Sequence, residues 1–414
     1  MTGDAFSRPG EEGVPSHRAG SCDIGFLVDK KEVLDLAKRL IRIPSRFRQE
    51  RRISKSVFGM LERWGFDPHS VDVPGCGPDV IAQTGPSSAP SLILNGHMDT
   101  VAVAPGWLHD PFGADVENGR LYGLGSLDMK SGLAGLMIAF RTISEHRLAK
   151  GLNVKLQVVS GEELNGVGTR TLVLRGEFRK AKAVLVGEGF GGLKVITNAR
   201  RGGYYYDIHV RGKAAHGALP EMGVNAVVDA SRAICAIDRM KMPLARRVLG
   251  EDLRPLGESQ TVLGISGGTR SLSVPDKCSF RLVRSVVPRR KGDPGCEIAE
   301  TIDALRLQSH VRVVLDDRPG EVYEPYLTSP QSSLVREAKA AARAVTGRTP
   351  RLVCGVSEAD DNIVAEETGT PVICVGPGEA GELARYHQAE ESVEVSQLGP
   401  ACEVYCRIAM GLVR

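Results

Sequence analysis

Residues 92–100 read Leu-Ile-Leu-Asn-Gly-His-Met-Asp-Thr, an apolar run that ends in a His-x-Asp motif. The run predicts a buried strand, and in an open α/β sheet ligands bind at the carboxyl ends of the strands. Side chains alternate between faces along a strand, so we expect His97 and Asp99 on the same side. His97 could then bind a metal ion while Asp99 holds its other ring nitrogen. By itself the motif is weak, because His-x-Asp occurs by chance in many proteins.

The length and composition predict a soluble protein of two domains. The chain has 414 residues, of which 42% are hydrophobic and 25% charged, and one hydrophobic core rarely serves so long a chain. The net charge of +3 is too small to predict nucleic-acid binding. No apolar run approaches the ~18 residues of a membrane span. We therefore expect a small-molecule substrate and neither a nucleic acid nor a membrane as partner.

The cysteines and the amino-terminal segment bear on location. Nine cysteines are scattered through the chain without a Cys-x-x-Cys motif, which favours reduced thiols and a cytoplasmic location. Residues 1–24 are mostly polar, rich in Gly, Ser and Pro, and without the apolar core of a signal peptide. This segment predicts a flexible tail.

Short apolar runs alternate with helical patterns over most of the chain. Predicted strands lie at 91–95, 154–159, 183–186 and 371–375, and predicted helices at 33–41, 129–146 and 333–345. Asp29 and Glu32, in front of the first of these helices, resemble a capping box. Strands that alternate with helices predict an α/β fold whose mostly parallel sheet is covered by helices on both faces.

The pattern changes near residue 200. A β-rich segment at 204–210, a helical one at 225–240 and strands near 260–265 and 279–287 follow one another. This order predicts a smaller α+β domain inserted at 200–319. The catalytic domain is then built from 25–199 and 320–414.

Further motifs bring histidine or carboxylate side chains to the ends of strands and loops. These side chains are Asp128 after the glycine-rich residues 122–125, Glu162 and Glu163 after the strand at 154–159, Glu188 after the strand at 183–186, and His387 in a late loop. Each alone has an ordinary explanation as a helix cap, an acidic turn or a solvated histidine. A phosphate-binding loop at 122–132 is disfavoured, because the glycine pattern is incomplete. With His97, and with one glutamate of the 162–163 pair as a ligand and its neighbour facing a bound water, the set has two histidines and three carboxylates. Such a set suits zinc, with cobalt or manganese as alternatives, and Asp128 is placed to bridge two ions.

With these motifs in this order, the chain resembles the dizinc amidohydrolase family of acetylornithine deacetylase, succinyl-diaminopimelate desuccinylase, aminoacylase and the bacterial glutamate carboxypeptidase. The resemblance runs from about residue 33 to residue 395. It implies a site for two divalent ions, with His97, Asp128 and Glu188 as ligands of one ion and Asp128, Glu163 and His387 as ligands of the other. It also implies that Glu162 is the general base and that Asp99 orients His97.

The inserted domain shares in the resemblance. Residues 212–217 and 223–226 are similar to the family's lid and dimerisation domain. This implies a homodimer in which His216 reaches the active site of the partner and donates to the oxyanion. In the implied reaction, two cations lower the pKa of a bridging water toward ~7, and Glu162 takes its proton as the hydroxide attacks an amide carbonyl.

The chain departs from the family where a substrate carboxylate would bind. Leu272 stands where the family has an asparagine, and Ser285 where it has an arginine. Arg284 is adjacent and is our candidate substrate contact, although a shift of one residue on a strand reverses the face unless a bulge intervenes. Further candidate anion contacts are Arg200, Arg201 and Arg270.

We therefore expect a metal-dependent hydrolase that cleaves the amide C–N bond of an N-acyl amino acid or a related small amide. The alternatives are a dipeptidase or carboxypeptidase, and a hydrolytic deaminase or carbamoyl-amide hydrolase on an atypical substrate. A catalytically silent binding protein is disfavoured, because the ligand set and Glu162 are all present.

Overall fold

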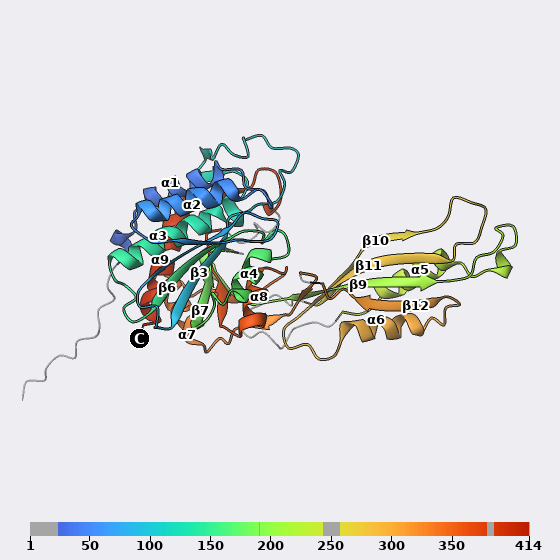
Figure 1. The fold of residues 1–414 in the computed structure, drawn as a ribbon. Helices are drawn as coiled ribbons and strands as arrows, with labels where there is room; N and C mark the ends of the chain where they lie inside the picture. The colour runs from blue at the N-terminus through green and yellow to red at the C-terminus, as the bar shows by residue number, and fades with distance from the viewer. Residues whose placement is uncertain (1–23, 190, 243–256, 319, 379–384, 414) are drawn as a thin grey trace, which may run out of the picture.

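The chain folds into a larger and a smaller domain, each built on its own sheet (Figure 1). The computed structural model describes residues 24–189, 191–242, 257–318, 320–378 and 385–413. Apart from Ile24, the predicted tail at 1–24 lies outside these residues. The predicted α/β class, with a mostly parallel sheet and a separate smaller domain, is confirmed.

The large sheet has the strand order β1-β2-β6-β3-β7-β16-β8-β14, with β15 paired to β8. Its strands are β1 (His69–Val71), β2 (Asp79–Thr84), β3 (Ser91–His97), β6 (Asn153–Val159), β7 (Ala181–Val186), β8 (Val195–Arg200), β14 (Tyr326–Leu327), β15 (Arg351–Gly355) and β16 (Val372–Cys374). The central pairs β3–β6, β3–β7 and β7–β16 are parallel. The carboxyl ends of these strands therefore meet at one edge, where the predicted site residues follow.

Helices cover this sheet on both sides. They are α1 (Lys30–Ile41), α2 (Arg51–Arg63), α3 (Ser131–Glu145), α4 (Val167–Leu174), α7 (Ser333–Thr346), α8 (Asp360–Thr368) and α9 (Val395–Gly411). The helices α1, α3 and α9 pack against one another, and α4 packs against α8 (Figure 1). No helix formed by the described residues is long and apolar enough to cross a membrane.

Helix α1 begins as the capping residues predict, with one difference. The Asp29 carboxylate accepts hydrogen bonds from the backbone N–H groups of Lys31 and Glu32. The Glu32 side chain does not return to the cap but binds the guanidinium of Arg141. Only the Asp29 half of the predicted capping box forms, because Glu32 binds a charged partner on α3 instead.

In the described residues, the small domain is an antiparallel sheet with two α-helices. Its strand order is β10-β11-β9-β12, with β13 paired to β9. The elements are β9 (Gly202–Arg211), α5 (Ala226–Asp238), β10 (Ser259–Gly267), β11 (Lys277–Val286), α6 (Pro294–Asp303), β12 (His310–Leu315) and β13 (Val322–Tyr323). The chain leaves the large sheet at Arg200 and returns to it at Tyr326, and β13 extends the small sheet past the predicted boundary at 319.

A third, three-stranded sheet joins segments that are far apart in sequence. It pairs β17 (Ser392–Glu394) with β5 (Arg120–Tyr122), which in turn pairs with β4 (Val116–Glu117). This pairing brings the segment after His387 beside the segment before Asp128. Short helical turns at Gly25–Leu27, Ser126–Lys130, Gly192–Lys194 and Pro220–Met222 complete the described elements.

Candidate metal centre

Asp128 lies between two histidines from distant parts of the chain. It follows a glycine turn in which Gly125 has a φ of 80°, a conformation that a side chain would disfavour. One carboxylate oxygen is 3.0 Å from Nε2 of His97, at the end of β3. The other is 3.3 Å from Nε2 of His387, in the loop before β17. A carboxylate in this position has one oxygen available toward each of two neighbouring sites.

Glu163 completes a group that could hold a cation. Its Oε2 is 3.3 Å from the Nε2 of His387. Within the described parts of the chain, potential ligand atoms of Asp128, Glu163 and His387 all lie within 4.8 Å of one another. An imidazole with two carboxylates is a borderline-to-hard donor set, so these residues fit a divalent ion such as zinc.

Glu188 lies close to this group without joining its contacts. It follows β7 and lines the same small pocket as His97 and Glu162. Its Oε2 is 3.9 Å from a guanidinium nitrogen of Arg200. The structure thus brings His97, Asp128, Glu163 and His387 into contact and places Glu188 at the wall beside them.

Asp99 contacts His97 in a different way from the one predicted. The His97 Nδ1 atom is 3.1 Å from the backbone carbonyl oxygen of Asp99 and 3.6 Å from its carboxylate. The carboxylate instead accepts hydrogen bonds from the backbone N–H groups of Glu162 and Glu163. Because β3 ends at His97, the chain can turn so that a main-chain carbonyl reaches the ring. The Asp99 side chain is then left to position the adjacent glutamates.

Burial and close contacts shift the pKa values of the side chains in the cluster. Burial disfavours the charged form of His97, but its hydrogen bonds with Asp128 and Asp99 raise its pKa well above the usual value. Hydrogen bonds with Asp128 and Glu163 raise the pKa of His387 to about 10. Burial raises the pKa of Glu188 to about 8 and that of Glu162 well above its usual value. Because metal ligands must be deprotonated, binding of an ion here would release protons.

The raised pKa of His387 predicts a pH-dependent stability of the metal-free protein. Below pH 6.5 the imidazole of His387 is protonated in both the folded and the unfolded chain. Its contacts with Asp128 and Glu163 then make their full contribution to the stability of the fold. The stabilisation is lost as the pH rises through the folded value of about 10. In chelator-treated samples, the Tm of the wild type should exceed that of His387→Ala near pH 6, and the difference should shrink toward pH 9. A difference that is constant or grows with pH would contradict these contacts.

His216 lies far from this cluster within one chain. It is exposed and belongs to the segment between β9 and α5. That segment lies at the end of the small domain that is remote from the large domain (Figure 1). Its Nδ1 accepts a hydrogen bond from the backbone N–H of Ala218 at 3.2 Å. The chain does not bring its own His216 to the metal centre.

Arg284 is not free to bind a substrate, and here the structure corrects the expectation. β11 pairs with β9 in an unbroken register from Lys277 to Val286, so no bulge turns this side chain to the other face. The Arg284 guanidinium is buried on the helix-covered face, 2.7 Å from the carboxylate of Glu258 and 3.3 Å from that of Glu297. The alternation of a strand puts Ser285 on the opposite face.

The other three arginines expected to contact an anion differ in their surroundings. Arg200 is fully buried and bound to Asp361, at 2.7 Å. Arg201 donates to the backbone carbonyl of Val356, whereas Arg270 is exposed. Arg200 and Arg201 thus contact other parts of the protein.

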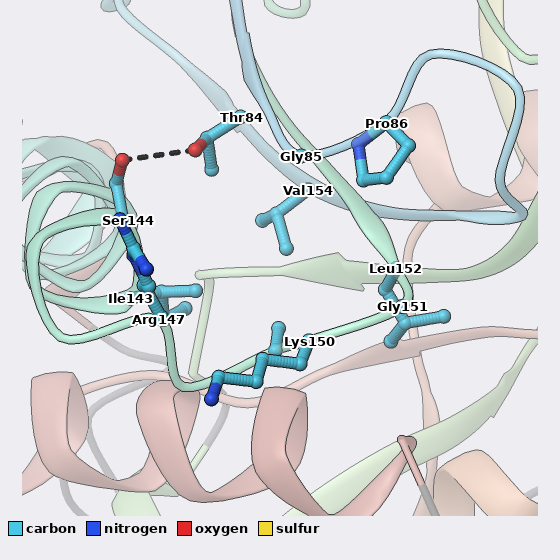
Figure 2. Close-up of a pocket in the computed structure, with 11 residues that line it drawn as sticks. Thr84, Gly85, Pro86, Ile143, Ser144, Arg147, Lys150, Gly151, Leu152 and Val154 are labelled. Carbon is cyan, nitrogen blue, oxygen red and sulfur yellow. Dashed lines mark hydrogen bonds between the residues drawn. The ribbon is translucent and has the colours of Figure 1, made fainter.

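A second pocket lies at the opposite edge of the large sheet (Figure 2). Its volume is about 440 Å³, and its wall includes Thr84 at the end of β2, Ser144 and Arg147 at the end of α3, and Lys150. It is next to the amino end of β6, whereas the metal centre is next to the carboxyl end. None of the predicted site residues lines it.

A sequence model of peptidase family M20/M25/M40 matches residues 93–411, which include every histidine and carboxylate of the cluster. The chain belongs to this family. The M20 chain is 28% identical over 393 residues to a succinyl-diaminopimelate desuccinylase of Marinobacter nauticus, an alignment that covers 92% of this chain and 98% of the relative.

Solved structures support the fold of this M20 protein. Aminopeptidase PepT from Bacillus cereus superposes with a TM-score of 0.75 at 23% identity, covering 94% of this chain and all of the other. The YXEP protein of Bacillus subtilis, described as a dinuclear metal-binding peptidase of the M20 family, superposes with a TM-score of 0.68 at 14% identity, covering 93% of this chain and 98% of the other.

The family membership settles the class of reaction. The M20 chain is a metal-dependent hydrolase of amide bonds, as the sequence predicts. The sequence analysis missed Glu391, whose carboxylate accepts hydrogen bonds from the backbone N–H groups of Gly125, Leu127 and Asp128. The acidic pair at 390–391 that closes the motif of His387 was the available signal.

Proposed function

We propose that this M20 protein removes an acyl group from an N-acyl amino acid or a related small amide, as a desuccinylase or deacetylase does. The observation that carries the proposal is Asp128 in contact with both His97 and His387, with Glu163 beside them. The desuccinylase relative, which aligns over nearly its whole length, supports the choice of reaction.

The proposed ligand roles are those that the resemblance implies, and the contacts among His97, Asp128, Glu163 and His387 support them. His97, Asp128 and Glu188 would hold one divalent ion, and Asp128, Glu163 and His387 the other. The donor set favours zinc, with cobalt and manganese as alternatives. When bound, such ions provide a water that is activated at neutral pH and polarise the carbonyl of the substrate.

Glu162 is the proposed general base. Its side chain lines the pocket with His97 and Glu188, and the bonds from Asp99 to the backbone of residues 162 and 163 hold it there. Burial raises the pKa of Glu162, so the carboxylate accepts a proton readily and can return it to the leaving amine.

The amine part of the substrate is not identified by the site, so a second candidate function is considered. Arg284 binds Glu258 and Glu297, so the anchor that we expected for a substrate carboxylate is occupied. Because N-acyl amino acids and dipeptides both carry a free carboxylate, this contact does not separate them, and a dipeptidase or carboxypeptidase is kept as the alternative. A panel of N-succinyl, N-acetyl and N-carbamoyl amino acids and dipeptides, assayed with zinc, cobalt and manganese, tests the proposal. Faster cleavage of dipeptides than of all N-acyl amino acids would overturn it.

We infer that the protein works as a homodimer through the small domain. β10 is an edge strand, and its Leu263 and Ile265 are 51% and 55% exposed. Leu219, Met222 and Leu272, in neighbouring loops, are 53%, 61% and 71% exposed. An unpaired edge strand with exposed apolar side chains favours pairing with a second chain. A partner could also supply the His216 that is missing from the metal centre of its own chain.

Subunit mixing is expected to show whether His216 acts across a dimer. Glu162→Ala and His216→Ala should each be nearly inactive alone. In a mixed dimer, one site combines the intact Glu162 of one subunit with the intact His216 of the other. Activity should therefore return when the two proteins are mixed and exchanged, as measured by hydrolysis of the best substrate. If mixing restores nothing while mixed dimers form, His216 does not act in trans.

We also propose a cytoplasmic location. All eight cysteines in the described part of the chain are free thiols, including the exposed Cys235 and Cys296. Free thiols of this kind are typical of a reducing compartment.

A further inference from the structure

Glu391 makes more contacts with the loop of Asp128 than any predicted site residue does. It is only 1% exposed. Its Oε1 accepts hydrogen bonds from the backbone N–H groups of Leu127, at 2.7 Å, and Asp128, at 3.0 Å. Its Oε2 accepts one from the N–H of Gly125 at 2.9 Å. Its backbone carbonyl accepts a fourth from the N–H of Gly123 at 3.1 Å.

These contacts join the two segments that carry metal ligands. Glu391 comes four positions after His387, and its bonds end on the backbone of Asp128 itself. Residues 387–391 and the hydrogen bonds of the Glu391 carboxylate therefore connect His387 to the backbone of Asp128. Farther from the site, the same two segments are also joined by the pairing of β17 with β5.

The backbone of this loop needs an external partner. Gly123 and Gly125 have φ values of 149° and 80°, so the loop is not a regular helix and its N–H groups have no helical acceptors there. Buried N–H groups without acceptors are costly, and a carboxylate that accepts several of them is held firmly in return. The buried Nζ of Lys130 donates to the carbonyl of Ile43. Burial lowers the pKa of Lys130 to about 7, whereas the nearby charge of Glu391 acts to raise it.

We propose that Glu391 is the positioning residue of the metal centre: it holds the Asp128 carboxylate at the place where it can contact both His97 and His387. This inference rests on the proposed metal site. Glu391 touches neither a substrate nor an ion, and it acts through the backbone of residues 125–128.

The neighbouring Glu390 offers a matched control. Its carboxylate accepts hydrogen bonds from the N–H groups of Leu108 and His109 and contacts the ring of His109, so it binds a different segment. Its side chain is 30% exposed, and it has no contact with the loop of Asp128 among those described. Glu390→Gln and Glu391→Gln remove the same charge from adjacent positions.

The test is the affinity of each metal-free variant for zinc and cobalt, measured by competition with a chelator. Glu391→Gln places an amide NH₂ among three N–H donors, so we expect it to bind the ions about tenfold to a hundredfold more weakly than the wild type, the usual cost of losing a group that positions a ligand. Glu390→Gln should bind them within about twofold of the wild type. The absorption spectrum of bound cobalt reports the geometry independently of activity.

Two results would overturn the inference. One is a folded Glu391→Gln protein with wild-type ion affinity and cobalt spectrum. The other, which needs no variant, is rapid hydrogen exchange at the N–H groups of Leu127 and Asp128 in the wild type, because Glu391 should protect them. A wild type that binds no ion at all would instead refute the proposed metal site, so the two failures are distinguishable.

Discussion

Replacing Glu162 with alanine should abolish turnover while both metal ions stay bound. Glu162 contributes its carboxylate to the pocket that His97 and Glu188 also line, and it has no contact with His387 among the described interactions. General acid–base catalysis contributes about 10²- to 10⁴-fold to a rate, so we expect kcat to fall by that factor. The measurements are kcat on the best substrate and the metal content of the purified variant.

The adjacent Glu163 gives the contrasting control. Glu163→Ala removes the carboxylate 3.3 Å from His387, so it should lower the metal content as well as the activity. Equal metal loss in both variants would mean that Glu162 is a ligand. A Glu162→Ala protein with wild-type kcat would show that another group is the base.

Replacing Asp128 with asparagine should have the largest effect on metal binding. The substitution keeps the size of the side chain but removes the charge that lies against His97 and His387. Because this carboxylate would serve both proposed sites, we expect the affinity for both ions to fall by at least about 100-fold, beyond the usual cost of losing an outer-shell partner. Calorimetric titration of the metal-free variant with zinc measures the stoichiometry and affinity.

Asp360→Asn provides the matched control for this variant. Asp360 is 4% exposed, lines the pocket with Glu162 and binds the hydroxyl of Thr169, but no described contact joins it to either histidine. It should keep both ions. If the two asparagine variants lose metal equally, the negative charge of the pocket matters and not the position of Asp128.

Periodic and local patterns predicted the elements of this protein. The apolar runs at 91–95, 154–159 and 183–186 are the central strands β3, β6 and β7, since buried parallel strands are recognisable as continuous apolar segments. Because the carboxyl ends of parallel strands meet at one edge, the same reasoning placed His97, Glu163 and Glu188 together.

Contacts between distant segments decided the rest. A capping box was predicted at Asp29, but Glu32 binds an arginine from another helix. Arg284 was expected to reach a substrate, yet its partners are Glu258 and Glu297, at positions that no local pattern links to it.

The sequence by itself determined the class of fold, the kind of ligands and the family, because strand periodicity and the order of short motifs are properties of neighbouring residues. The tertiary structure alone decided that the Asp99 carbonyl faces His97 and that the Glu391 carboxylate accepts hydrogen bonds from the loop of Asp128. The physical reason is that a hydrogen bond goes to whichever partner the fold brings within reach, and that partner can be hundreds of residues away.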